Sequence, residues 1–264
     1  MIDRRPEKVA SHVMDLEQVL GIGGGTSVAA GTCDDLTCGD VLVVCAAASL
    51  SANTSRSVYL EENAAIVDGM TERLAGWDGV VVMVTNPVDP LCARLAMRLG
   101  DRRRVIGYTL NDSLRLRTAI GRGLGVPAGD VEAWVLGEHG DGAVPVFSRV
   151  RVRGEAVTLD AAQREAAADF VHTWYQRHVA LDSGRSSTWT SGAGAARMVA
   201  ALARGDAEPW VASVLLDGEY GLSGVALGVP VELGPRGVER VVEWELAPDE
   251  LAALSPAAGS PADT

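Results

Sequence analysis

The sequence predicts an α/β protein with a doubly wound, Rossmann-like parallel sheet followed by a C-terminal α+β domain. Three observations predict this fold class. Wholly apolar runs at 41–46 and 79–84 are typical of parallel strands that are buried on both faces. Segments with apolar residues at helical spacing alternate with these runs, as in right-handed βαβ crossovers. Beyond residue 108 the alternation gives way to longer helices and neighbouring β-type runs.

The elements of the first half follow from local signals. A proline near its start and the helical spacing of Val9, Val13 and Leu16 predict a helix over 6–19. Gly21–Gly25 resembles a phosphate-binding loop, but such a loop leaves a strand and opens a helix, whereas this run leaves a helix. We therefore predict a flexible connection there. The remaining elements are strands over 27–31, 41–46 and 79–84 and helices over 57–73 and 90–99.

The second half combines longer helices with β runs that suit antiparallel pairing. Its predicted helices cover 112–124, 160–179 and 188–203, and its predicted strands cover 131–136, 146–152, 156–159, 211–216, 224–233 and 237–246. We expect a first domain over 1–108, a second over 109–254, and a flexible tail rich in Ser, Pro, Ala and Gly over 255–264.

The composition argues against several classes of partner. A net charge of -12 disfavours nucleic acid and anionic membranes, and no apolar run approaches the length of a membrane span. The first residues lack the apolar core of a signal peptide, so we expect a cytoplasmic protein. The four cysteines form no CxxC pair and the histidines show no metal-ligand spacing, so we expect no metal.

The segment Gly137–Asp141 (GEHGD) is the strongest single sign of chemistry. Glycines on both sides of His139 clear space for a ligand, and an imidazole exchanges protons near neutral pH. By itself the pattern also suits a polar surface turn. Ligands of doubly wound sheets collect at the carboxyl ends of the strands, which here are followed by 46–49 and 85–89.

Several motifs in order give the chain a family resemblance. Met1-Ile2-Asp3 is similar to a strand end with a ribose-binding carboxylate, and 84–89 (VTNPVD), 112–115 (DSLR) and 137–141 follow. Late landmarks are Glu219-Tyr220-Gly221 and Val229-Pro230. In this combination the sequence resembles the L-lactate/malate dehydrogenase family, NAD-dependent 2-hydroxyacid dehydrogenases, from Asp3 to about Leu254.

The resemblance implies roles for individual residues. His139 would exchange a proton with the substrate oxygen, Asp112 would orient its ring, and Arg56 would polarise the carbonyl. Arg115 would clamp the substrate carboxylate with its planar fork. Taken singly, Asp112 suits a helix N-cap, and Arg115 and Arg56 suit ordinary surface charges. Further substrate-binding residues would be Asn86, Leu50 and Thr188, and NAD would lie against Asp3, Ala46, Ala47, Asn63, Thr85 and Asn86.

The chain also departs from the family pattern. It begins where the family's first βαβ unit, with its glycine loop, finishes. The chain is therefore a fragment, has a start site that was assigned too late, or is a genuine N-terminal truncation. Ala47 and Ala52-Asn53 replace family glycines and a proline, and the end is short of the family's long final helix. Leu50 offers no partner to a second carboxylate, which disfavours malate and favours a 2-oxo acid with an apolar side chain.

Two functions therefore stay open. The first is a small-molecule dehydrogenase, which by resemblance would form a homodimer or homotetramer. The alternative is a catalytically inactive or non-redox relative that no longer binds NAD in the usual way.

Overall fold

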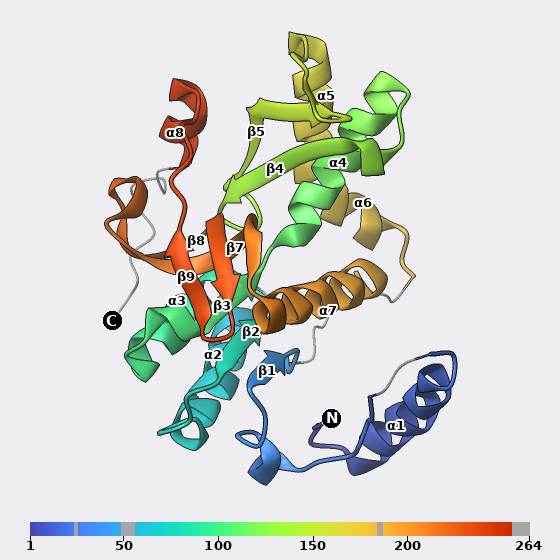
Figure 1. Cartoon of the computed structure of the whole chain (residues 1–264), viewed down its shortest axis with the longest axis vertical. Coiled ribbons are helices and arrows are strands. Elements are labelled where there is room, and N and C mark those ends of the chain that lie inside the picture. Colours follow the sequence, from blue (N-terminus) through green and yellow to red (C-terminus); the bar gives the residue numbers. More distant parts are fainter. Residues whose placement is uncertain (24–25, 49–55, 184–186, 255–264) are drawn as a thin grey trace.

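A computed structural model describes residues 1–23, 26–48, 56–183 and 187–254, with the side chains of 56–58 and 206–208 left aside. Its described strands form one mixed sheet in the order β1-β2-β3-β7-β8-β4-β5-β6, with β9 paired to β8 (Figure 1). The strands are β1 (Val41–Val44), β2 (Val80–Met83), β3 (Val105–Tyr108), β4 (Val131–Gly137), β5 (Ala143–Val152), β6 (Glu155–Ala156), β7 (Asp206–Asp217), β8 (Ser223–Gly234) and β9 (Gly237–Val241).

The sheet has a parallel and an antiparallel part. Strands β1, β2 and β3 run parallel, whereas the pairs that involve β4 to β9 are antiparallel. The two parts meet where β3 pairs with β7, with Gly107 opposite Ser213 and Tyr108 opposite Ala212. A side chain at Gly107 would lie within 2.7 Å of the Ser213 Cβ, so this junction requires a glycine. The fold is the expected α/β architecture with a C-terminal α+β part.

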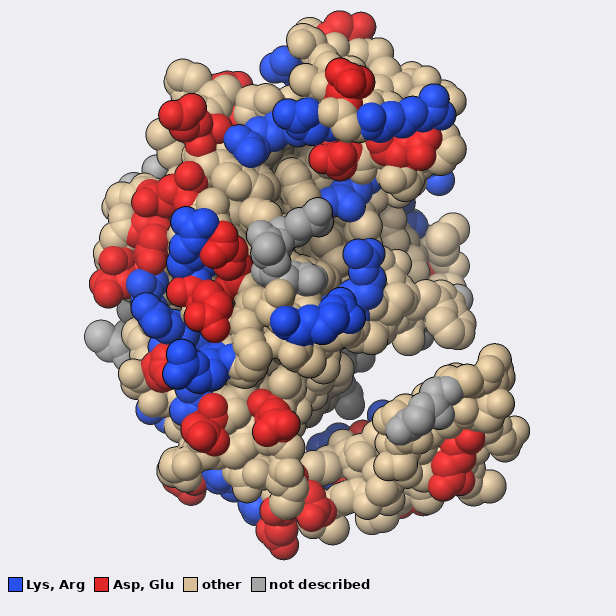
Figure 2. Space-filling model, in the orientation of Figure 1, with Lys and Arg blue, Asp and Glu red and all other residues tan. Residues whose placement is uncertain are grey.

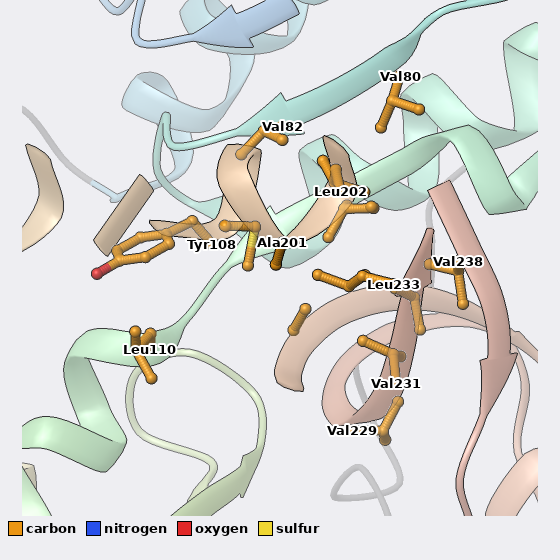
Figure 3. Close-up of a cluster of buried hydrophobic side chains, with 14 of the residues drawn as sticks. Val80, Val82, Tyr108, Leu110, Ala201, Leu202, Val229, Val231, Leu233 and Val238 are labelled. Atoms are coloured by element: carbon orange, nitrogen blue, oxygen red, sulfur yellow. The ribbon is translucent and has the colours of Figure 1, made fainter. Parts of the chain in front are cut away.

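Helices cover both faces of the parallel strands. They are α1 (Pro6–Leu20), α2 (Arg56–Arg73), α3 (Val88–Leu99), α4 (Leu110–Leu124), α5 (Ala161–His172), α6 (Trp174–Ala180), α7 (Thr188–Arg204) and α8 (Pro248–Leu254). Because strand side chains alternate between faces, Val80 and Val82 pack with α7, whereas Val81 and Met83 pack with α3. Figure 3 shows the first of these cores, where Leu202 of α7 lies near Val82 and Leu233.

The N-terminal segment has little contact with the rest of the molecule. Helix α1 stands off from the body of the protein (Figures 1 and 2), and Met14 on it is 66% exposed. Elsewhere on the face shown in Figure 2, Lys and Arg side chains alternate with Asp and Glu side chains. Within the described ranges, none of the helices is long and apolar enough to cross a membrane.

The strand predicted over 27–31 is wrong. This segment makes two backbone hydrogen bonds with Met1, from the Met1 amino group to Ala29 O (2.6 Å) and from Gly31 N–H to Met1 O (2.7 Å). No ladder follows, and 1–3 form no strand either. The small residues of 27–31 bury too little apolar surface to hold a strand pair.

Other predictions erred at boundaries. The helix predicted over 160–179 is two helices, Ala161–His172 and Trp174–Ala180, with Thr173 (φ −91°, ψ −2°) between them. The hairpin partner of β5 is Glu155–Ala156 rather than 156–159, and the last strand ends at Val241 rather than at 246. Strand β3 was not predicted, since Gly107 interrupts its short apolar run and the run follows the charged turn Arg102–Arg104.

A candidate active site at the histidine turn

The histidine turn begins where β4 ends. Gly137 has φ +83° and Gly140 has φ +141°, backbone conformations that L side chains rarely adopt. A Cβ on Gly137 would also lie 2.6 Å from Gly142 O. The two glycines therefore let the chain reverse tightly around His139, whose side chain is 18% exposed.

Helix α4 brings two charged residues to this turn. The Nδ1 atom of His139 lies 2.5 Å from Asp112 Oδ2, and Arg115 Nη1 donates to Asp112 Oδ1 over 2.7 Å. The side chains of Asp112 and Arg115 are 7% and 15% exposed. A single carboxylate thus joins an imidazole and a guanidinium in a largely buried position. Because Nδ1 is engaged, Nε2 is the ring atom left to exchange a proton with a ligand.

The charges around His139 set its protonation. Burial by itself would lower the pKa of His139, but the negative charge of Asp112, its hydrogen bond and the charge of Asp89 outweigh burial. The pKa of His139 is therefore raised. Burial lowers the pKa of the Arg115 guanidinium, and Asp112 opposes that effect. The arrangement favours a positively charged imidazole beside a carboxylate.

Asp89, near the start of α3, contacts the same turn from the opposite side. Its Oδ2 accepts the backbone N–H of His139 over 2.7 Å, and its side chain is almost fully buried. Burial raises the pKa of Asp89 to about 6, although the nearby Ser213 hydroxyl and the hydrogen bond from the His139 N–H act in the other direction. His139 is thus held between two carboxylates.

The segments after β1 and β2 are tied to each other at the carboxyl edge of the sheet. The Thr85 hydroxyl donates to Ala46 O (2.7 Å). Asn63, which is fully buried, accepts the Ala48 N–H and donates to Asn86 O, both over 2.7 Å. Thr85 and Asn63 therefore shape this edge through the backbone. The side chains of Ala46, Ala47 and Asn86 are exposed there.

One aromatic ring lies over the Arg115 guanidinium. Its Cζ lies 4.1 Å from the centroid of the Trp174 ring. Trp174 in turn stacks on His178, with centroids 4.9 Å apart and planes 11° apart. The stack limits how the guanidinium can rotate, which keeps its donor edge in one plane.

A buried polar network joins the start of α4 to the start of α7. The Tyr108 hydroxyl donates to Asn111 Oδ1, and Asn111 Nδ2 donates to Ser191 Oγ, both over 2.9 Å. Gly194 makes room for the tyrosine, because a Cβ there would lie 1.9 Å from its hydroxyl oxygen. Thr188 is the first residue of α7, so this network fixes the position of its backbone relative to α4.

The other predicted site residues lie elsewhere or outside the described part. Asp3 accepts the Arg5 N–H (3.0 Å) and pairs with Lys8 (3.3 Å) at the start of α1. Arg56 begins α2, but its side chain is outside the described set, and Leu50 lies outside the described residues. The structure thus brings His139, Asp112 and Arg115 together, and it places the segment of Asn86 next to them through Asp89.

Sequence reasoning missed three contributors to this region. The sequence places Asp89 in a recognised motif without indicating a role for it, predicts only a helix at Trp174, and gives no sign of a role for Asn111. The position of Asp89 between apolar residues at the start of a buried helix was a usable signal. Nothing local in the sequence marks Trp174 or Asn111.

Comparisons with known proteins agree along nearly the whole chain. The family model for the lactate/malate dehydrogenase NAD-binding domain matches residues 1–107, and that for the alpha/beta C-terminal domain of the same enzymes matches 109–260. A malate dehydrogenase of Halobacterium salinarum is 38% identical over 97% of this chain and 85% of its own length. An L-lactate dehydrogenase of Treponema denticola is 32% identical over 94% of this chain and 82% of its own.

Solved structures give the same result. The malate dehydrogenase of Aeropyrum pernix superposes with a TM-score of 0.88 at 29% identity, over 96% of this chain and 84% of that one. A lactate dehydrogenase of Cryptosporidium parvum, complexed with lactic acid and nicotinamide adenine dinucleotide, superposes with a TM-score of 0.86 at 28% identity and the same coverage.

Proposed function

The chain belongs to the lactate/malate dehydrogenase family of NAD-dependent hydroxyacid oxidoreductases, and we propose that His139, Asp112 and Arg115 form its catalytic centre. One observation carries the proposal: the Asp112 carboxylate bonds the imidazole and the guanidinium at once, at 2.5 and 2.7 Å. This contact combines a proton donor with a carboxylate clamp, the two groups that reduction of a 2-oxo acid requires.

The described residues fit the nicotinamide end of the cofactor. The exposed edge of Ala46 and Ala47 leaves backbone accessible, and the Asn86 side chain is exposed three residues before Asp89, which holds His139. We infer that Ala46, Ala47 and Asn86 contact NAD, while Thr85 and Asn63 hold that edge in place. NAD, when bound, supplies or accepts the hydride. The contact between Asp3 and the ribose stays a prediction. In the structure the two carboxylate oxygens of Asp3 are engaged by the Arg5 N–H and by Lys8.

The proton passes through His139. In the reducing direction the imidazolium donates from Nε2 to the oxygen of the 2-oxo acid, and in the oxidising direction the neutral ring takes that proton back. Asp112 keeps the Nδ1 proton on its own side and stabilises the positive ring. The raised pKa of His139 agrees with a proton donor that stays charged near neutral pH.

Arg115 would hold the carboxylate of the substrate. Asp112 occupies its Nη1, and the rest of the fork offers a bidentate edge to a planar anion. The Trp174 ring covers one face of the guanidinium and leaves the edge as the direction of approach. Arg56 and Thr188 complete the proposed site as the carbonyl-polarising group and a wall of the pocket.

For the substrate we infer a 2-oxo acid with an apolar side chain rather than oxaloacetate. The support is Leu50. It occupies the position at which an arginine of the family would pair with the second carboxylate of malate, and leucine carries no charge that could do so. Relatives with both names, malate and L-lactate dehydrogenase, match the chain. The variant Leu50→Arg should therefore raise kcat/KM for oxaloacetate relative to 2-oxoisocaproate by about tenfold or more, the scale of one ion pair in a pocket. Faster oxaloacetate reduction by the unaltered chain would refute the preference.

A fluorescence titration with NADH, with and without oxamate as a substrate mimic, tests the function. We expect saturable NADH binding that oxamate tightens, followed by turnover of 2-oxo acids. Arg115→Lys is the matched variant, because it keeps the charge and removes the fork, and it should lose the oxamate effect while it still binds NADH. Absence of NADH binding would favour the non-redox alternative.

We also infer a homodimer or homotetramer, which rests on the family resemblance. Light scattering after size-exclusion chromatography would measure the mass directly. A monomer at micromolar concentration would refute this inference.

A further inference from the structure

Asp89 is a buried carboxylate whose environment does not favour its charge. It lies on the second residue of α3, and its side chain is 5% exposed. One oxygen accepts the His139 N–H over 2.7 Å. Ser213 faces the carboxylate and lowers its pKa, yet among the described residues neither Asp89 Oδ1 nor Ser213 Oγ has a hydrogen bond of good geometry.

A neutral amide would serve the fold at this position at least as well. The oxygen of an asparagine could accept the His139 N–H, and its NH₂ group could donate to Ser213 Oγ. Both orphan atoms would then be satisfied, and the cost of burying an ion would vanish. Holding the turn together therefore does not require a carboxylate. The feature that needs explanation is the negative charge itself.

The neighbour that gains from this charge is His139. We propose that Asp89 is a positioning residue that both fixes the backbone of His139 and keeps a second negative charge beside the imidazole, so that the imidazolium persists at neutral pH. Asp112 acts on the ring through Nδ1, whereas Asp89 acts from the backbone side. The proposal rests on the proposed role of His139 as proton donor, but its test requires neither NAD nor substrate.

The surrounding charges agree with this role. The groups that face Asp89 are His139, Glu138 and the buried Cys92 thiol. The charge of Glu138 raises the pKa of Asp89. Burial and the charge of Asp89 raise the pKa of the Cys92 thiol well above its usual value. The groups that face His139 are Asp112, Asp89 and Arg115. Because the pKa of Asp89 is about 6, Asp89 is ionised above that pH. The pKa of His139 is raised, so Asp89 carries its charge in the pH range in which His139 loses its proton.

Histidine titration by NMR in the free chain tests the proposal. The Cε1–Hε1 signal of His139, assigned by its absence in His139→Gln, is followed against pH in the unaltered chain and in Asp89→Asn. We expect the apparent pKa of His139 to fall by on the order of one pH unit in the variant, the effect of one nearby charge. The matched control Asp78→Asn removes the same charge from an exposed site at the opposite end of β2, and should leave the titration unchanged.

Two outcomes would overturn the proposal. One is a folded Asp89→Asn chain in which His139 titrates as before, which would make Asp89 a structural anchor only. The other needs no variant and applies even if Asp89→Asn does not fold. In the unaltered chain the Cγ signal of Asp89 should titrate near pH 6, and the His139 signal should show the same inflection. Independent titrations would refute the coupling, whether or not the chain turns over 2-oxo acids.

Discussion

Replacing Asp112 with asparagine removes one charge from the centre of the site and alters few contacts in the fold. The carboxylate has two partners, His139 Nδ1 at 2.5 Å and Arg115 Nη1 at 2.7 Å, and all three side chains are largely buried. An asparagine oxygen can keep only one of these partners. If its NH₂ group turns toward Nδ1 instead, the imidazole proton moves to Nε2, the wrong tautomer for a base.

The size of the effect follows from these contacts. A hydrogen bond to a charged group contributes about 1.5–3 kcal/mol, and 1.36 kcal/mol corresponds to one pKa unit, so the pKa of His139 should fall by roughly one to two units. Reduction requires the imidazolium, so its rate declines as pH rises through this pKa. Above the pKa, each unit lost costs about tenfold in reduction. For a fall of one to two pKa units, kcat/KM for reduction should therefore fall about 10–10²-fold at pH values above the pKa.

The assay is NADH oxidation followed by absorbance between pH 5 and 9. The falling limb of the reduction profile should move to lower pH in Asp112→Asn, and the rate of reduction at neutral pH should fall. Asp160→Asn is the matched control, because asparagine caps α5 as well as aspartate does, and it should change neither rate nor profile. A folded Asp112→Asn chain with unaltered pH limbs would refute the role of Asp112.

Three further outcomes follow from packing and hydrogen bonding. Trp174→Leu, which removes the ring over Arg115, should raise KM for the 2-oxo acid about 2–30-fold without changing the affinity for NADH. Trp174→Phe should restore most of the affinity for the 2-oxo acid, and an equal rise of KM in both variants would contradict the stacking role. Met198→Ala, in the fully buried core under α7, should lower the free energy of unfolding by about 2–5 kcal/mol in urea titrations, and a loss under 1 kcal/mol would mean that the core collapses to fill the space. Glu250→Ala should leave the backbone N–H groups of Ser148 and Ala247 without their acceptor and lower the free energy of unfolding by about 1.5–3 kcal/mol. Glu250→Gln should lower the free energy of unfolding by less, because its amide oxygen still accepts a hydrogen bond.

Much of the fold could be predicted from the sequence because its strongest elements carry repeated local signals. The apolar runs of β1 and β2 and the helical spacing of α1, α3 and α7 are visible in short windows. The association of Asp112, Arg115 and His139 was visible only as a combination of motifs, and the structure places His139 and Arg115 each in hydrogen-bonding contact with Asp112. Their catalytic roles stay a prediction until turnover is measured.

What the sequence could not predict depends on contacts between distant segments. Strand β3 has no continuous apolar run, because Gly107 interrupts it, and it is held by β7, which pairs with it from more than 100 residues later. The pKa of about 6 for Asp89 arises from burial under elements far away in the chain. None of these causes leaves a periodic pattern in the residues concerned.

The site is built across the division proposed at residues 108 and 109. Asp89 comes from the first part of the chain, and His139 and Asp112 come from the second, so the hydrogen bond of 2.7 Å from the His139 N–H to Asp89 joins the two parts at the proposed reacting group. A displacement of one part against the other would break this bond and would leave a buried carboxylate and a buried N–H unpaired, which is costly. The same contact that supplies charge to the imidazole therefore also fixes its distance from the sheet edge at Asn86. A single hydrogen bond thus orients the proton donor and aligns the two parts of the chain.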